Sequence, residues 1–367
     1  MADPATNGVS AAVHRHVTLH LAADPVLTTR RCSTGVWVRA DLTFAWPPTR
    51  MPGMRSLSRR QFSRLVAVSP LLARGMSSPG ALPARPLGKI DFQAGILGFG
   101  AQRVGEDRSD QSTVDRIVGE ALESGLNYID TAPNYGFSEE RLGRALSGKR
   151  DQVFLVSKIE TRTRGEALGQ IRDSLRKLQT DYLDGVLFHN IGREDRFPDF
   201  DQLLSANGAL GGLLEARKQG MIRHLGCSTH TNPARVLRAF QTGEFALLMC
   251  PLNFAARHLY ALEEKLLPEA RRRNIAVIAM KPLGGPLGRG VGARLGSRED
   301  YRATLRYVWG IPGVALAIIG LRTPEELRQA LAAAASFRPL EASELNALAE
   351  RGKVLAAQWG PLHGPPI

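Results

Sequence analysis

Short apolar runs alternate with amphipathic stretches along the chain from about residue 95 onward. Runs of about four to eight residues rich in Val, Ile, Leu and Phe are typical of strands that are buried on both faces of a sheet. Apolar residues spaced three and four apart, as in 114–122 and 168–178, predict helices with one buried face. The predicted strands are residues 95–100, 128–130, 153–157, 183–188, 222–227, 245–250, 275–280 and 314–319.

Eight strands that are each followed by a helix predict a parallel sheet joined by crossover helices. The stretch 85–367 has the length of a closed eight-stranded barrel, which is typically about 250 residues long. We therefore expect an α/β fold, a (β/α)8 TIM barrel, in this stretch. Residues 341–357 continue the helical pattern beyond the last unit, so an extra C-terminal helix is expected.

Three successive predicted strands end on an ionisable residue: Asp130, Lys158 and His189. Tyr135 lies in the loop after the first of them, which Pro133 and Gly136 mark as irregular. Neighbouring parallel strands lie about 5 Å apart, and α/β barrels keep their chemistry at the rim where the strands end. The four side chains are therefore predicted to share one site.

A family resemblance rests on these residues. The phrase Asp-Thr-Ala-x-x-Tyr-Gly beginning at Asp130, with Glu139, Glu140 and Leu142-Gly143 after it, resembles the tetrad region of the aldo-keto reductases. Asp130, Tyr135, Lys158 and His189 follow in the order of that tetrad. The resemblance extends from about residue 85 to 320 and beyond, and it implies a short N-terminal β-hairpin ahead of the first barrel strand.

The resemblance implies an NADP-dependent aldo/keto reductase acting on CH-OH donors, which reduces an aldehyde or ketone to an alcohol by hydride transfer. Tyr135 would donate the proton. A free tyrosine has a pKa of about 10, and a lysine ammonium close by is expected to lower it. Lys158 would play that part, Asp130 would hold Lys158 charged, and His189 would orient the substrate oxygen.

Each of the four residues also has a structural reading. Asp130 would suit a turn before Pro133, and Tyr135 would suit an exposed surface loop. Lys158 would suit a solvated strand end, and His189 would suit a polar residue whose hydrogen bonds are satisfied within the fold. Four matches in the expected order favour the catalytic reading over four separate structural ones.

The predicted cofactor site begins at the strand ending on Ser228. Ser228 matches the family's residue for the nicotinamide carboxamide, and Thr229 stands where the family usually has Asn. A hydroxyl can still bind an amide. Met249 occupies the place of a Gln that often assists, so that contact is in doubt.

The next part of the site is the run at 279–285. Met280 stands where a tyrosine stacks under the nicotinamide in many members, although it would equally suit core packing. Lys281, Pro282 and Leu283 follow, and Lys281 is expected near the pyrophosphate. The glycine-rich loop 284–296 is expected to fold over the cofactor.

The last part follows Gly320. Thr323 and Glu326 predict a capping box at a helix start, and helix starts attract phosphate. Arg322, just before them, is the candidate for the 2′-phosphate of NADPH, so NADPH is favoured and NADH is the alternative cofactor. Glu326 and Ala330 depart from the family's usual adenosine contacts. Trp359 in the tail suits either a wall of the substrate pocket or a docking anchor.

The formal charge of +13 would by itself suggest nucleic acid or an acidic membrane. Residues 1–84 hold ten arginines, three aspartates and no lysine or glutamate, so more than half of the surplus falls there. The modest remainder suits a globular body with a phosphate site. We expect a small-molecule carbonyl substrate and no nucleic-acid or membrane partner; the oligomeric state stays open.

Residues 1–84 have no sustained helical or strand period and are interpreted as a leader. Arg59-Arg60 before the apolar run 65–73 forms a twin-arginine export signal, which predicts a periplasmic protein; otherwise it is cytoplasmic. The pattern would lie near the N-terminus if translation began at Met51 or Met54. A disordered basic tail and an organelle transit sequence are the alternatives.

The three cysteines, Cys32, Cys227 and Cys250, have no C-x-x-C spacing, and no histidine pair has metal spacing. We expect no disulfide and no metal site.

Two other functions stay open. Some aldo-keto reductase relatives couple cofactor state to a partner protein, so a nicotinamide-binding regulatory or sensor subunit is one alternative. An unrelated barrel lyase or isomerase with a Schiff base on Lys158 is the other.

Overall fold

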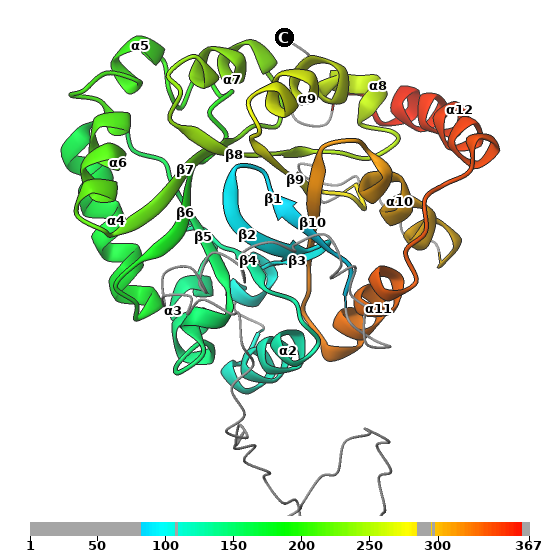
Figure 1. Cartoon of the computed structure of the whole chain (residues 1–367), viewed down its shortest axis with the longest axis horizontal. Helices are drawn as coiled ribbons and strands as arrows, with labels where there is room; N and C mark the ends of the chain where they lie inside the picture. Colours follow the sequence, from blue (N-terminus) through cyan, green and yellow to red (C-terminus); the bar gives the residue numbers. More distant parts are fainter. Residues whose placement is uncertain (1–81, 107–108, 285–294, 296–297, 362–367) are drawn as a thin grey trace, which may run out of the picture. The chain divides into compact units, whose positions relative to one another are not determined.

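The computed structural model describes residues 82–106, 109–284, 295 and 298–361. Eight parallel strands in this part of the chain close into a barrel in the order β10-β3-β4-β5-β6-β7-β8-β9 (Figure 1). Their bounds are β3 Leu97–Gly100, β4 Tyr128–Asp130, β5 Phe154–Ile159, β6 Leu183–Phe188, β7 Ile222–Ser228, β8 Phe245–Pro251, β9 Ala276–Met280 and β10 Val314–Gly320. The predicted (β/α)8 TIM barrel is confirmed.

Helices surround the barrel as an outer ring (Figure 1). They are α2 Gln111–Glu123, α3 Ser138–Ala145, α4 Arg164–Leu178, α5 Phe200–Leu203, α6 Ala209–Lys218, α7 Pro233–Phe240, α8 Arg257–Tyr260, α9 Leu262–Arg272, α10 Arg298–Gly310, α11 Pro324–Ala335 and α12 Ala342–Trp359. Helix α12 is the expected extra C-terminal helix. Its bounds differ from the predicted 341–357 by one residue at the start and two at the end, as is usual for helix ends.

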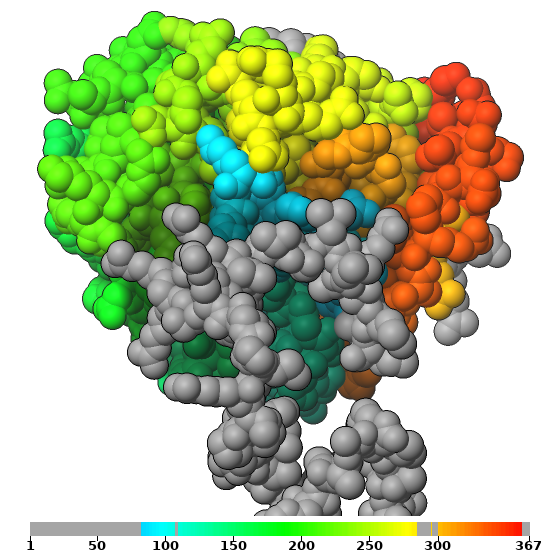
Figure 2. Space-filling model, viewed as in Figure 1, coloured from blue at the N-terminus to red at the C-terminus, as the bar shows by residue number. Residues whose placement is uncertain are grey.

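An antiparallel hairpin of β1 (Ala84–Leu87) and β2 (Ile90–Gly95) crosses the end of the barrel at which the strands begin. Lys89 N donates to Asn274 O at 2.8 Å, just before β9. Gly88 in the turn has φ +58°, and a Cβ there would lie 2.5 Å from Ala276 N, so only glycine fits. Figure 2 shows the hairpin in cyan in the middle of this face, beside the yellow segment that carries α9. The hairpin that the family resemblance implied is present.

Two apolar layers explain the continuous apolar runs of the strands. Alternate strand residues such as Tyr128, Phe154 and Leu187 fill the barrel interior together with Leu87 from the hairpin. The residues between them, such as Ile129 and Leu155, pack outward against the helices. Because nearly all residues of the barrel strands are buried, on both faces, most of these strands show no alternation of polar and apolar residues.

Two local expectations differ from the structure. Residue 95 belongs to β2 rather than to the first barrel strand, because the hairpin occupies it. Thr323 caps α11 by accepting from Glu326 N at 3.2 Å, but the Glu326 carboxylate accepts from Arg322 N at 2.7 Å instead of completing the predicted capping box.

The predicted leader, residues 1–84 with the arginine pair 59–60, lies almost wholly outside the described residues and stays a prediction. The same holds for Cys32 and for most of the rim loop 284–296. Among the helices of the described ranges, none combines the length and apolarity needed to cross a membrane. Cys227 and Cys250 are buried free thiols.

Candidate active site

Asp130 and Lys158 form an ion pair inside the rim at which the strands end. The Lys158 Nζ lies 2.8 Å from Asp130 Oδ1, 2.7 Å from Oδ2 and 2.8 Å from the Thr131 carbonyl oxygen. Both side chains are almost completely buried, at 1% and 2% exposure. Burial acts to lower the pKa of Lys158, but Asp130 and Tyr135 outweigh it, so the pKa of Lys158 stands above its ordinary value. The ammonium is therefore held charged at neutral pH.

Tyr135 lies over this pair, on the loop between β4 and α3. The Lys158 Nζ is 4.7 Å from the centre of its ring. The loop is fixed by close backbone packing, because a Cβ on Gly105 would lie 1.6 Å from the Tyr135 carbonyl oxygen. Phe137 N also donates to Gly105 O at 3.0 Å. Sequence reasoning did not identify Gly105 as part of the site.

The direction of the Tyr135 pKa corrects the expectation from the sequence. Burial raises the pKa of Tyr135 above its ordinary value, and the Asp130 carboxylate adds to the rise. The Lys158 cation acts in the expected, lowering direction but does not outweigh burial. A cation paired with a carboxylate exerts only part of its field on a third group. The phenol therefore stays protonated at neutral pH, which a proton donor requires.

His189 follows β6 directly, and its backbone N donates to Ile159 O at 2.9 Å. Its ring meets the Tyr135 ring edge to face, with the centroids 5.8 Å apart. Nδ1 lies 2.6 Å from Oε1 of Glu160, a residue that the sequence analysis did not single out. Burial lowers the pKa of His189, and Glu160 opposes this shift. The four predicted tetrad residues are thus brought together at one rim.

Ser228 and Thr229 lie at the same rim, but their hydroxyls are already engaged. Ser228 Oγ accepts from Asn190 N at 2.9 Å and donates to Phe188 O at 3.3 Å. Thr229 Oγ1 donates to Thr231 O. Both residues are buried. Of the two, Ser228 has the longer and therefore weaker donated bond.

The segment 280–283 leaves β9 at the rim. Met280 packs in the barrel interior with Met249, and only 9% of it is exposed, so little of its side chain is free to meet a ligand. Lys281 has φ +52°, and its carbonyl accepts from Asn253 Nδ2 at 3.1 Å. Burial lowers the pKa of Lys281. Pro282 is buried beside it, and Leu283 packs against the outer apolar layer.

Gly320 ends β10, and Arg322 follows it at the start of α11. The Arg322 Nη2 donates to Glu106 Oε2 at 2.8 Å, across the rim from the loop after β3. Its buried Nε has no hydrogen-bond partner in the part of the chain that the structure describes. Glu106 was not predicted from the sequence, because its partner lies more than two hundred residues away.

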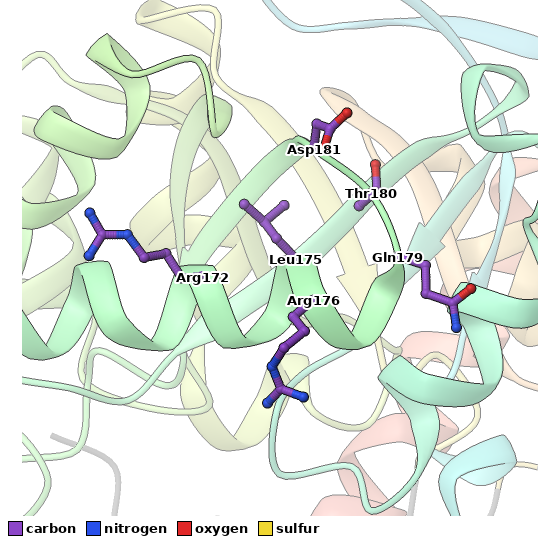
Figure 3. A pocket seen from close by; sticks show the side chains of 6 residues that line it. All are labelled: Arg172, Leu175, Arg176, Gln179, Thr180 and Asp181. Carbon is purple, nitrogen blue, oxygen red and sulfur yellow. The ribbon is translucent and has the colours of Figure 1, made fainter.

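A shallow hollow on the described surface lies away from this rim. It follows the end of α4 and the turn into β6, at the opposite end of that strand from His189 (Figure 3). Its lining is Arg172, Leu175, Arg176, Gln179, Thr180 and Asp181. None of these side chains belongs to the rim constellation. Nor do the described residues contain a cluster of three or more His, Cys, Asp or Glu side chains suited to a metal ion.

Comparisons with known proteins show which family the chain resembles. A model of the aldo/keto reductase family matches residues 96–298. Methylglyoxal reductase YeaE from Escherichia coli (strain K12) is 32% identical over 202 residues, covering 53% of this chain and 66% of that protein. The matched part of the chain therefore spans just under two thirds of that relative.

Solved structures extend the likeness. Aldo-keto reductase AKR11C1 from Bacillus halodurans, in its holo form, superposes with a TM-score of 0.61 at 25% identity, covering 73% of this chain and 96% of that one. An aldo/keto reductase from Klebsiella pneumoniae, in complex with NADP and acetate, gives 0.58 at 25% identity, covering 71% of this chain and 92% of that one.

Proposed function

The chain belongs to the aldo/keto reductase family, and we propose that it reduces an aldehyde or ketone to an alcohol with NADPH, with Tyr135 as the proton donor. The observation that carries the proposal is the buried Asp130 and Lys158 pair under the Tyr135 ring. Two buried charges are costly to maintain, and buried, strongly perturbed ionisable groups cluster at functional sites. The related Klebsiella pneumoniae enzyme holds NADP, which supports the choice of cofactor.

NADPH would supply the hydride to the carbonyl carbon. Charge then develops on the carbonyl oxygen, and Tyr135 would donate its proton to that oxygen. The Lys158 ammonium, 4.7 Å from the ring centre, would stabilise the phenolate that remains. Asp130 would keep Lys158 charged and in place, and His189 would bind the same oxygen and set its angle.

The residues at the ends of β9 and β10 suit an anionic cofactor. Lys281 has no carboxylate partner among the described side chains, and Arg322 has an unpartnered Nε. A helix start such as that of α11 also attracts phosphate. We assign Arg322 and Gly320 to the adenosine phosphate end, and Lys281 to Leu283 to the pyrophosphate. Met280 would present its small exposed part to the nicotinamide.

The carboxamide of the nicotinamide would be bound at the end of β7. Ser228 donates only a long bond of 3.3 Å to Phe188 O, so its hydroxyl can turn to an amide at low cost. Thr229 lies next to Ser228 and is assigned to the same carboxamide site. Its own hydroxyl donates to the carbonyl oxygen of Thr231.

The test is a fluorescence titration with NADPH, followed by NADPH oxidation assays with a panel of carbonyl compounds that includes methylglyoxal. Saturable binding with turnover well above buffer supports the proposal. Binding without turnover on any carbonyl would favour a nicotinamide-binding sensor subunit instead.

The Schiff-base alternative is disfavoured by the state of Lys158. An amine must be neutral to attack a carbonyl, whereas the pKa of Lys158 is raised and its ammonium is bound to Asp130. Borohydride trapping of a carbonyl compound on Lys158 would reverse this conclusion.

A further inference from the structure

The loop that follows β3 lies directly against the backbone of Tyr135. A Cβ on Gly105 would lie 1.6 Å from the Tyr135 carbonyl oxygen, and a Cβ on Gly136 would lie 2.3 Å from the Gly105 carbonyl oxygen. Gly105 O also accepts from Phe137 N at 3.0 Å. Because two glycines meet here without side chains between them, the position of the Gly105 backbone determines that of Tyr135.

This loop has little regular structure of its own. Arg103–Gly105 form a single turn of 3₁₀-helix, in which Gly105 N donates to Gln102 O at 3.2 Å and Glu106 N donates to Arg103 O at 3.3 Å. Both bonds are longer than usual, and a short turn of this kind is weakly stable by itself. The loop therefore depends on contacts from elsewhere in the fold to keep one position.

Arg141 of α3 supplies two of these contacts. Its Nη1 donates to Val104 O and to Glu106 O, each at 2.7 Å, so one nitrogen bridges the carbonyls on either side of Gly105. A cationic donor makes shorter and stronger hydrogen bonds than a neutral one. Arg141 thus holds the loop on both sides of the residue that packs on Tyr135.

Helix α3, which carries Arg141, has anchors of its own. Ser138 Oγ donates to Ala101 O at 2.9 Å where the helix begins, and it lies 2.8 Å from Thr131 Oγ1. Both hydroxyl residues are fully buried. The Arg141 guanidinium also lies 5.1 Å from the centre of the Phe137 ring. Arg141 therefore reaches the loop from a fixed helix, and its loss should free the loop rather than the helix.

We propose that Arg141 is a positioning residue for Tyr135: it keeps the loop after β3 against the Tyr135 backbone, and the loop keeps the phenol in place over Lys158. The effect of Arg141 on the reaction rate rests on the proposed reductase function. Its effect on the backbone does not, because that effect follows from contacts within the free protein.

Loss of Arg141 should slow the chemical step more than it weakens binding. The proton donor must lie within hydrogen-bond reach of the substrate oxygen, and a displacement of about 1 Å can cost about a hundredfold in rate. In Arg141→Met saturated with NADPH, the single-turnover rate should fall by at least about tenfold, while the carbonyl concentration that gives half the maximal rate changes by less than about threefold. A substitution that only destabilised the fold would leave the rate per folded molecule unchanged.

The direct experiment is amide hydrogen exchange of the whole chain, measured by mass spectrometry without cofactor or substrate. In Arg141→Met the segment 134–139 should exchange faster than in the wild type, by at least about tenfold, because the Phe137 N–H loses a fixed acceptor. The strands β5 and β6 should exchange as in the wild type. Arg144→Met is the matched control, since it makes the same change on an exposed residue of the same helix, and it should alter neither exchange nor rate.

Unchanged exchange of the segment 134–139 in a folded Arg141→Met protein overturns the proposal. Faster exchange with an unchanged single-turnover rate overturns it as well. If Arg141→Met does not fold, as judged by circular dichroism, Arg141→Gln decides on the same readouts, because glutamine is shorter than arginine and carries no charge. Faster exchange with no reductase activity in any protein, the wild type included, would reject the proposed function and leave the role of Arg141 in the loop intact.

Discussion

The Lys158 ammonium contacts both oxygens of the Asp130 carboxylate, at 2.8 and 2.7 Å, in a part of the barrel that water does not reach. Register explains how the two meet. Asp130 ends β4 opposite Val156, and Lys158 lies two residues further along β5, on the same inward face. The pair therefore lies at the inner edge of the rim, directly under Tyr135.

Lys158→Met should abolish reductase activity and destabilise the fold by about 3–5 kcal/mol, because it leaves Asp130 buried without its partner. Urea unfolding monitored by circular dichroism measures the loss of stability. The matched control is Lys177→Met, which breaks a partly exposed pair with Glu140 and should cost about 1 kcal/mol or less. Equal losses of stability in the two variants would contradict the burial of the Asp130 and Lys158 pair.

Glu106→Gln should tighten NADPH binding, because Glu106 occupies the Arg322 guanidinium that we assign to the 2′-phosphate. NADH lacks that phosphate, so its affinity should change little. Arg322→Ala should weaken NADPH by about tenfold or more and leave NADH nearly unaffected. Fluorescence titrations with both cofactors give the comparison. A parallel change for NADH and NADPH in Arg322→Ala contradicts the assignment.

Glu263→Gln should stabilise the protein at alkaline pH. Glu263 is partly buried in α9 and accepts from the Tyr307 hydroxyl at 2.8 Å, and desolvation raises its pKa from 4.5 to about 7. The folded state thus keeps a proton that the unfolded chain releases between these two values. The contribution of Glu263 to stability therefore falls as the pH rises through this window, by up to about 3 kcal/mol.

Unfolding by urea at pH 5 and pH 8 tests the Glu263 prediction. Glu263→Gln should lose less stability than the wild type between the two values. Glu350→Gln, on α12, where Glu350 is 72% exposed and paired with Lys353, is the control and should behave like the wild type. An unchanged pH dependence in Glu263→Gln would show that Glu263 titrates normally.

The sequence could predict the barrel and the tetrad because both depend on local pattern. Strand ends can be located from apolar runs, and neighbouring parallel strands place Asp130, Lys158 and His189 at one rim without any further information. The C-terminal helix also follows from the pattern of a short segment, whereas the hairpin was implied by the family resemblance.

Contacts between distant loops could not be predicted in this way. Glu160 and Glu106 depend on the course of irregular segments, which no period describes. From the sequence we expected the Thr229 hydroxyl to be able to bind an amide. In the structure it donates to the carbonyl oxygen of Thr231, two residues further along the chain. The pKa of Tyr135 depends on the balance between burial and two opposite charges, and the sequence indicated only the favourable one.

The most direct test of the central claim is the single-turnover rate of carbonyl reduction by Tyr135→Phe saturated with NADPH. We expect the affinity for NADPH to stay within about twofold of the wild type, and the rate to fall by at least about a hundredfold, because a ring without a hydroxyl has no proton to give. An unchanged rate in a folded, cofactor-saturated variant would contradict Tyr135 as the proton donor.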